Sequence, residues 1–413
     1  MSLRSAGFRR AIVVLAGFGT AVAVSTGASA APNATSAGNL SARVDAALAG
    51  SSAGTVGVRV EVSGLGVVTS HNAFAALPPA STQKSFVALT ALDVLSPASP
   101  LRTAVRGPSV GSDGVVRGPL VLVGGGDPTL SSAHLGGLAA ELRARGVRIV
   151  TGGLLGDDSL FDQVRSAPGW KPAFMPGESG PLSALVVDRN QWRWDTAYLR
   201  DPVVGNLDRF RAVLAKAGIS VRGPDRRGTS RTATRQLATH DSLPMSALVA
   251  GMLKNSDNLA AEMLLKRLGA TRGPGTTARG LTVVREHLAS LGVSMGSAAD
   301  GSGLSAYDRE TPAGEVALLR AAEASVTGTT LRHSMSIGCV DGTLKHRFCG
   351  TPGSGRVFAK TGTLDFVRVL SGYTTTRSGR QVWFSFMLSG CRNGAACRVA
   401  IDRAVVALAA YPG

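Results

Sequence analysis

A serine and a lysine three residues apart, Ser81-x-x-Lys84, stand directly before a long apolar run at 85–92. Pro78 and Pro79 lie just upstream, and a proline disfavours the helical conformation in the residue before it, so a helix is predicted to begin after this pair. Residues three apart on a helix share a face, which predicts that the Ser81 hydroxyl and the Lys84 amine are neighbours. A neutral amine beside a serine hydroxyl can take its proton and make it a nucleophile. The spacing therefore predicts an active-site serine with a lysine base.

Two further short motifs follow in order, Ser256-Asp257-Asn258 and Lys360-Thr361-Gly362-Thr363. The second motif falls in a region with a helical pattern. The third ends a predicted strand, where Gly362 leaves room for a substrate backbone. Each motif alone is weak evidence, but the chain has only seven lysines, and two of them fall at these points. The ordered set disfavours the simpler interpretation that Ser81 is a helix cap and that both lysines are solvated surface residues.

The first 30 residues have the pattern of a cleaved secretory signal peptide. A basic start precedes an apolar run and an A-x-A cleavage site; these features are Arg4, Arg9, Arg10, 11–24 and 28–30. The mature chain is then predicted to begin at Ala31, with the choice between general and twin-arginine export left open. No second apolar stretch is long enough to span a bilayer, so the mature protein is expected to be secreted without a transmembrane anchor.

All four cysteines, Cys339, Cys349, Cys391 and Cys397, lie in the last quarter of the chain. An exported protein favours disulfides, and two short loops, Cys339–Cys349 and Cys391–Cys397, are the economical pairing. The two other ways of pairing the four cysteines remain possible, as does the alternative that all four are buried free thiols. The chain has no C-x-x-C motif or standard zinc-ligand spacing, so neither a metal nor another cofactor is predicted.

The formal net charge of +17 becomes +14 without the first 30 residues, which carry three arginines and no acidic residue. The arginines are scattered, and aromatic residues make up only 5% of the chain. Because a nucleic-acid surface needs clustered cations and aromatic stacking platforms, nucleic acid is not expected as a partner. We interpret the charge mainly as a compositional bias, with attraction to an anionic bacterial wall as a consequence.

The pattern of apolar residues predicts an α+β protein with a split main domain. Alternating or β-rich segments occur near both ends of the chain, at 57–62, 66–70, 356–360, 367–374 and 381–388. Helical spacing occurs at 40–48 and 396–410, so strands from both ends are predicted to form one antiparallel sheet flanked by helices. The middle differs, with strand-like runs at 118–123, 147–154 and 182–187 and a helix at 133–145. We predict a main domain of 31–100 and 238–413 and an inserted, smaller α+β domain at 101–237.

The three motifs together resemble those of the penicillin-recognising serine acyl-transferases, which include penicillin-binding proteins and serine β-lactamases. Four longer segments are similar to the D-alanyl-D-alanine carboxypeptidase/endopeptidase branch, the class C low-molecular-mass penicillin-binding proteins. These segments are GGGDPTL at 124–130, SDNLAAE at 256–262, DGSGLS at 300–305 and DGTL at 341–344. The resemblance implies a β-lactamase/transpeptidase-like fold with an inserted domain, shorter here than in the larger members.

The resemblance also implies roles for the motif residues. Ser81 would attack the peptide bond between two terminal D-alanines, with Lys84 as its base and Ser256 passing the proton to the leaving nitrogen. Asn258 would position the substrate amide and hold Lys84. Lys360 would attract the terminal carboxylate, with Thr361 and Thr363 donating hydrogen bonds to it. The backbone N–H groups of Ser81 and Thr363 would form the oxyanion hole. Substrates would be peptidoglycan stem peptides ending in D-Ala-D-Ala, and β-lactam antibiotics would be covalent inhibitors.

Two other functions stay open at this stage. A β-lactamase of class A would need a glutamate in an E-x-x-L-N loop after the second motif, and that string does not occur. A catalytically silent wall-binding or sensor protein on the same fold is disfavoured by the intact motifs. Two departures leave substrate side-chain preference open: 336–340 lacks the expected Leu-Pro-x-Ala-Gly, and Asp365 stands where the branch often has a small or hydroxyl residue. The segment 300–303 is expected to be a structural loop near the site.

Overall fold

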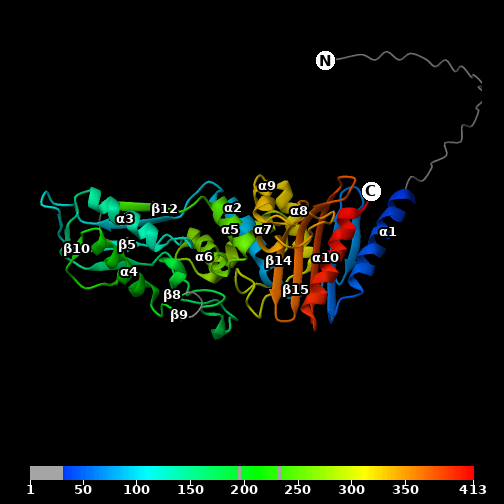
Figure 1. The fold of residues 1–413 in the computed structure, drawn as a ribbon, viewed down its shortest axis with the longest axis horizontal. Coiled ribbons are helices and arrows are strands. Elements are labelled where there is room, and N and C mark those ends of the chain that lie inside the picture. Colours follow the sequence, from blue (N-terminus) through cyan, green and yellow to red (C-terminus); the bar gives the residue numbers. More distant parts are fainter. Residues whose placement is uncertain (1–30, 194–196, 231–234) are drawn as a thin grey trace, which may run out of the picture.

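The computed structural model describes residues 31–193, 197–230 and 235–413, so the predicted signal peptide lies outside the described residues. The molecule is elongated, with one lobe at each end of its long axis and a group of helices between them (Figure 1). The helices are α1 Ala31–Leu48, α2 Lys84–Leu95, α3 Ser132–Ala144, α4 Pro202–Lys216, α5 Met245–Asn255, α6 Asn258–Gly269, α7 Thr277–Ser290, α8 Pro312–Ala324, α9 Gly328–Ser334 and α10 Gly394–Ala410.

One lobe contains a six-stranded antiparallel sheet in the order β13-β14-β15-β16-β1-β2. Its strands are β1 Thr55–Val62, β2 Gly66–His71, β13 Ser336–Ile337, β14 Phe358–Leu364, β15 Val367–Thr375 and β16 Gln381–Ser389. Strands from the two ends of the chain meet where β1 pairs with β16 along its whole length, from Thr55 opposite Ser389 to Val62 opposite Val382. The predicted sheet built from both chain ends is therefore confirmed.

The two faces of this sheet are covered by different helices. Helices α1 and α10 pack on one face, where their apolar side chains join inward-facing residues of β1 and β16, including Leu40, Val60, Phe384 and Ile401. The other face carries a second core built mainly from α2 and α5–α9. In α2 all residues from Lys84 to Leu92 are buried, because a helix that is apolar on every side is stable only when other elements surround it.

The second lobe is built from the chain between β3 and β12. A five-stranded sheet has the order β11-β7-β5-β3-β12, and a three-stranded sheet has the order β10-β6-β4. The strands are β3 Arg102–Gly107, β4 Val115–Val116, β5 Leu120–Val123, β6 Ile149–Val150, β7 Leu154–Asp157, β10 Ser220–Val221, β11 Arg226–Arg227 and β12 Arg235–Asp241, with a small hairpin of β8 Gln191–Arg193 and β9 Ala197–Tyr198. Helices α3 and α4 pack on these sheets around a core of their own, which includes Leu122, Leu138 and Phe210.

This architecture agrees with the predicted α+β class and inserted smaller unit, while the exact boundaries 100/101 and 237/238 stay predictions. Two local predictions are wrong: the third motif lies inside β14 (Phe358–Leu364) rather than at the end of a strand, and 182–187 forms no strand. Its apolar residues are buried, and Ala184 accepts a backbone hydrogen bond from Gly126 (2.9 Å) without entering a ladder. The alternation at 182–187 reflects burial between the lobes, where Ala184 and Val186 pack against Leu259 of α6.

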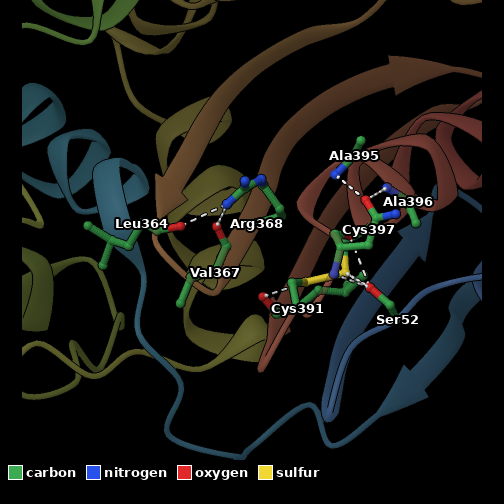
Figure 2. Close-up of a disulfide and its surroundings, with 10 residues drawn as sticks. Ser52, Leu364, Val367, Arg368, Cys391, Ala395, Ala396 and Cys397 are labelled. Carbon is green, nitrogen blue, oxygen red and sulfur yellow. Dashed lines mark hydrogen bonds between the residues drawn. A yellow bond between two sulfur atoms is a disulfide. The ribbon is translucent and has the colours of Figure 1, made fainter.

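The two economical disulfides are confirmed. Cys339 is bonded to Cys349, and Cys391 is bonded to Cys397 at the start of α10 (Figure 2). Within the described residues, no helix has both the length and the apolar character needed to cross a membrane.

We predict that these disulfides contribute to stability through the loops that they close. Each loop is short, with the paired positions separated by 10 and 6 residues in sequence, so each bond should contribute about 2–3 kcal/mol to the free energy of unfolding. The paired variants Cys339→Ser/Cys349→Ser and Cys391→Ser/Cys397→Ser should each lose this amount in denaturant titrations. Non-reducing peptide mapping of the secreted protein is the companion measurement, and cross-paired or free cysteines there would contradict the assignment.

Candidate active site

Ser81 lies in a tight 3₁₀ turn, Ala80–Gln83, directly before α2 rather than in the α-helix itself. Residues three apart eclipse one another in a 3₁₀ turn, which places the side chain of Lys84 under that of Ser81. Ala80 enters the turn with φ of 48°, a left-handed conformation that is strained for a residue with a side chain and that concentrates at functional sites. Ser81 and Lys84 are therefore neighbours as predicted, but a 3₁₀ turn rather than an α-helix brings them together.

Two glycines allow other segments to press against this turn. A Cβ atom on Gly362 of β14 would lie 2.7 Å from the Pro79 carbonyl oxygen. Gly303 has φ of +81°, and a Cβ atom there would lie 1.8 Å from the Ala80 carbonyl oxygen. Any side chain at either position would push the third motif or the 300–305 loop away from Ser81.

The Lys84 amine is fully buried and makes three hydrogen bonds. Its Nζ donates to Ser81 Oγ at 2.9 Å, to Asn258 Oδ1 at 2.8 Å and to the Ser302 carbonyl oxygen at 2.6 Å. These three acceptors use all three protons of an ammonium group. The contacts bring the first and second motifs together at one nitrogen, within hydrogen-bonding distance of the predicted nucleophile.

The second motif forms the break between α5 and α6. Ser256 ends α5 in the left-handed conformation, with φ of 56°, and Asp257 caps α6 by accepting a hydrogen bond from the Ala260 N–H group (3.0 Å). Arg189 of the inserted unit forms a bidentate ion pair with Asp257 at 2.5 and 3.0 Å. The middle residue of the motif is thus structural. It fixes the turn from which Ser256 and Asn258 reach the site.

Asn258 connects Lys84 with the inserted unit. Its amide nitrogen donates to the Glu178 backbone oxygen at 3.0 Å and to Glu178 Oε2 at 3.1 Å, while its oxygen accepts from Lys84. Because the amide nitrogen is a donor and the oxygen an acceptor, these partners fix which way the amide points.

The third motif lies on β14, beside the second. Lys360 is fully buried, and its Nζ donates to Ser256 Oγ at 2.9 Å and to the Thr361 carbonyl oxygen at 2.8 Å. The Thr361 hydroxyl donates to Thr343 Oγ1 at 2.9 Å. Thr363 lies two residues further along the strand with an exposed side chain. The predicted site residues thus form two linked groups, Ser81–Lys84–Asn258 and Ser256–Lys360–Thr361.

Burial is the main influence on the charge of Lys84. Removal from water lowers the pKa of this amine from 10.5 to about 8. Nearby carboxylates, Asp300 and then Glu262 most strongly, oppose this shift because their charge favours the ammonium form. The lowered pKa leaves roughly a tenth of Lys84 neutral at pH 7, so its neutral form is within reach as a base.

Two buried carboxyl groups near the 300–305 loop have raised pKa values. Burial, followed by the charge of Asp300, raises the pKa of Glu262 to about 8. The same two causes raise the pKa of Asp308 to about 9. Since Glu262 is mostly protonated at neutral pH, it attracts the Lys84 ammonium less than a full negative charge would. This is one reason why burial determines the direction of the shift at Lys84.

Lys360 is affected in the same direction. Burial and then the positive charge of Lys84 lower the pKa of Lys360 well below its ordinary value. Two buried amines so close in space disfavour each other's charge. An anionic ligand placed beside Lys360 would reverse that effect and favour its charged form.

Several residues in the site were not predicted as functional from the sequence. The sequence predicts that 300–303 is a structural loop near the site, and its Ser302 carbonyl oxygen accepts a hydrogen bond directly from the Lys84 amine. Glu262 holds that loop by accepting the N–H groups of Gly301 (2.9 Å) and Ser302 (2.8 Å). No sequence signal marked Glu178, because its contact with Asn258 spans 80 residues and depends on the placement of the inserted unit.

Comparison with known proteins identifies the class. The model of the D-Ala-D-Ala carboxypeptidase 3 (S13) family matches residues 39–198 and 196–411, and the chain belongs to this family of serine peptidases. The D-alanyl-D-alanine carboxypeptidase of Actinomadura sp. (strain R39) is 32% identical, over 82% of this chain and 78% of that protein. A carboxypeptidase of Mycobacterium tuberculosis is 30% identical, over 75% of this chain and 71% of that protein.

Solved structures agree on the fold. Penicillin-binding protein 4 of Haemophilus influenzae superposes with a TM-score of 0.80 at 23% identity, covering 88% of this chain and 98% of that one. A penicillin G-acylated predatory endopeptidase of Bdellovibrio bacteriovorus gives a TM-score of 0.57 at 18% identity, covering 85% and 92%. The recognised class C penicillin-binding protein family and the β-lactamase/transpeptidase-like fold are both confirmed.

The burial of Lys84 predicts a specific pH dependence for acylation by penicillin. Only the neutral amine can take the Ser81 proton, so the second-order rate constant should rise about tenfold per pH unit up to a pKa near 8 and then level off. Quenched-flow mass spectrometry between about pH 5.5 and pH 10 would record this rise of the rate constant with pH. A rate constant that is flat from about pH 6 to 9, or that still rises steeply at about pH 10, would contradict the lowered pKa.

Proposed function

We propose that this protein is a secreted serine-type D-Ala-D-Ala carboxypeptidase/endopeptidase that cleaves peptidoglycan stem peptides through an acyl-enzyme. The carrying observation is the buried Lys84 amine, whose Nζ lies 2.9 Å from Ser81 Oγ. Nucleophile and base are already within hydrogen-bonding distance, as nucleophilic catalysis requires. The family assignment supplies the substrate class, in which the scissile bond joins two terminal D-alanines.

In the proposed acylation step, neutral Lys84 takes the Ser81 proton as the oxygen attacks the carbonyl carbon of the penultimate D-alanine. The backbone N–H groups of Ser81 and Thr363 stabilise the oxyanion that forms. Collapse of the tetrahedral intermediate breaks the C–N bond. Ser256 then gives its hydroxyl proton to the leaving nitrogen, which departs as the amine of free D-alanine, and the proton that Lys84 took from Ser81 replaces it on Ser256. The hydrogen bond from Lys360 to Ser256 Oγ (2.9 Å) supports this relay, because it orients the hydroxyl.

We further propose that Lys360, Thr361 and Thr363 hold the terminal carboxylate of the substrate. Lys360 is buried and its pKa is lowered, so it is poised to gain a charge when an anion arrives. Carboxylate binding would then be coupled to protonation of Lys360. Asn258 would position the substrate amide, since its side-chain orientation is fixed by Lys84 and Glu178.

Deacylation completes the cycle. A water molecule attacks the ester carbonyl, gives one proton back to Ser81 and releases a stem peptide shortened by one D-alanine. Penicillins carry a reactive amide and a carboxylate in a comparable arrangement, so we propose that they acylate Ser81 as well. Turnover of the peptide separates this function from that of a silent wall-binding protein on the same fold.

The location and the division of the chain are proposals as well. Export through the signal at 1–30 would bring the mature chain to the bacterial wall, where its net positive charge favours an anionic polymer. We propose that the inserted unit at 101–237 acts as an accessory domain that steadies the second motif. Its contacts with that motif, from Arg189 to Asp257 and from Glu178 to Asn258, support this role.

The nucleophile is tested by labelling with penicillin. One covalent adduct should form, on the peptide that contains Ser81, as shown by intact mass and peptide mapping. Ser81→Ala should form none and should lose D-Ala-D-Ala hydrolysis, while keeping the wild-type melting temperature. A labelled Ser81→Ala protein would disprove the assignment.

Substitution of the two lysines should have different effects on activity. Lys84→Ala removes the base, so penicillin capture and peptide hydrolysis should fall together. Lys360→Ala removes a charge-assisted contact of about 1.5–3 kcal/mol and should lower kcat/KM on D-Ala-D-Ala peptides roughly ten- to a hundredfold. On the C-terminally amidated peptide the loss should be much smaller, because the partner charge is absent.

The exposed Lys216 offers a matched control, and Lys216→Ala should leave both substrates unaffected. If Lys360→Ala loses the same factor on the free acid and on the amide, Lys360 acts through Lys84 or through the fold. The role as carboxylate anchor would then be rejected.

A further inference from the structure

A buried carboxyl group of helix α8 contacts the 3₁₀ turn 80–83, which we call the Ser81 turn. The Oε1 atom of Glu315 is hydrogen-bonded to the hydroxyl of Thr82, the second residue of the Ser81 turn to carry a hydroxyl. Its Oε2 atom is hydrogen-bonded to the hydroxyls of Ser371 and Ser385, which lie opposite each other on β15 and β16. This carboxyl group therefore links α8 and two strands of the main sheet to the Ser81 turn.

The hydroxyl of Thr82 has one proton but two oxygen partners. Its Oγ1 lies 2.7 Å from the carbonyl oxygen of Pro79 and is also hydrogen-bonded to Glu315 Oε1. A carbonyl oxygen has no proton to give, so the Thr82 proton serves the contact with Pro79. The proton in the contact between Thr82 and Glu315 then has to come from Glu315. The hydrogen-bond pattern therefore calls for a protonated carboxyl group.

The contacts of the other carboxyl oxygen agree with this assignment. Ser371 Oγ contacts Glu315 Oε2 and lies 2.8 Å from Ser385 Oγ, and Ser385 Oγ lies 3.1 Å from the same Oε2. The two serine protons can serve two of these three contacts, and the longest contact is the one left without a proton. Since Oε2 needs no proton of its own, the acid proton can lie on Oε1, where it faces Thr82.

The surroundings of Glu315 favour its neutral form. Its hydrogen-bond partners among the described residues are uncharged hydroxyls, which balance a buried carboxylate less well than a cation would. Burial raises the pKa of Glu315 to about 7, and the charge of Glu310 acts in the same direction. The hydrogen bonds to Ser371 and Thr82 oppose this shift without overcoming it.

The charged side chains on the elements around Glu315 have other partners. These side chains are Arg59 and Glu61 of β1, Lys84 of α2, Lys360 of β14, and Glu310 before α8. Arg59 and Glu61 form an ion pair with each other at 2.7 Å. Both lysine amines are directed to serine hydroxyls of the active site. Within the described residues, none of these three cations is hydrogen-bonded to Glu315.

We infer that Glu315 is a positioning residue for Ser81: as a neutral carboxyl group it donates a hydrogen bond to Thr82. The Thr82 hydroxyl is then left to hold the Pro79 carbonyl oxygen, which closes the Ser81 turn on itself. The turn needs this support because Ala80 enters it with a left-handed φ of 48°. The inference rests on the proposed function and adds to it the group that holds the nucleophile in place.

The Thr82 side of this contact is tested through acylation of Ser81 by penicillin at about pH 6, where Glu315 is mostly protonated. Thr82→Val removes only the hydroxyl and should lower the acylation rate constant about five- to a hundredfold, with the affinity of the initial noncovalent complex unchanged. Thr82→Ser keeps the hydroxyl and should stay within about threefold of the wild type. Thr374→Val is the matched control and should equal the wild type, because it removes a buried β15 hydroxyl that has no hydrogen-bond partner among the described residues.

Variants of Glu315 distinguish a neutral donor from a charged group. Glu315→Gln can donate an N–H group to Thr82 and should keep the rate constant within about threefold of the wild type. Glu315→Leu fills a similar volume without a donor and should lose the same factor as Thr82→Val. The double variant Glu315→Leu/Thr82→Val should be no slower than the single variants, because both changes remove one hydrogen bond. The infrared difference between wild type and Glu315→Gln at about pH 6 should contain the band of a protonated carboxyl group.

Four results would each overturn the role of Glu315. These are a wild-type rate constant in Thr82→Val, a Glu315→Gln variant as slow as Glu315→Leu, additive losses in the double variant, and an infrared difference without the protonated carboxyl band. If Glu315→Leu does not fold, the Thr82 variants and the infrared measurement still decide. Failure of the proposed function looks different, because penicillin would then not acylate Ser81 in the wild type.

Discussion

The site depends on the removal of one amine from water. Lys84 lies at the start of a helix that is buried on every side, and its Nζ meets acceptors from the Ser81 turn, the second motif and the 300–305 loop. Those acceptors would suit an ammonium, whereas burial favours the neutral amine. The balance gives a pKa of about 8, which leaves a group that holds the site together and that can also act as a base.

This arrangement has a cost in stability. A lysine with a pKa of about 8 in the folded chain and 10.5 when unfolded binds its proton less tightly after folding. Its effect on stability is therefore most favourable above the unfolded pKa, and about 3 kcal/mol is lost as the pH falls from 10.5 to 8. Glu262 and Asp308 affect stability in the opposite sense. Because their pKa values are raised in the folded chain, their contribution to the free energy of unfolding falls as the pH rises. The large cores on both sides of the main sheet must offset these terms, as is common where a site is built for function.

The sequence was sufficient for the parts of the molecule that local patterns determine. Periodicity identified the strands at both chain ends, and the motif spacing predicted that Ser81 and Lys84 are neighbours, as the structure has them. The sequence was not sufficient where tertiary contacts determine the structure. The segment 182–187 alternates like a strand because it is buried between the lobes. Glu178 reaches Asn258 only through the placement of the inserted unit. The Ser302 carbonyl was missed for a similar reason, since any residue type presents the same backbone oxygen.

The central claim, that burial keeps Lys84 partly neutral at physiological pH, can be measured directly. With seven lysines in the chain, NMR of protein labelled at the lysine side-chain Cε and Nζ atoms gives few signals, and Lys84→Arg assigns the relevant one. The account predicts that this signal titrates near pH 8 in the free enzyme and stops titrating there when penicillin occupies Ser81. A Lys84 signal that titrates at the ordinary value of 10.5 would contradict the account.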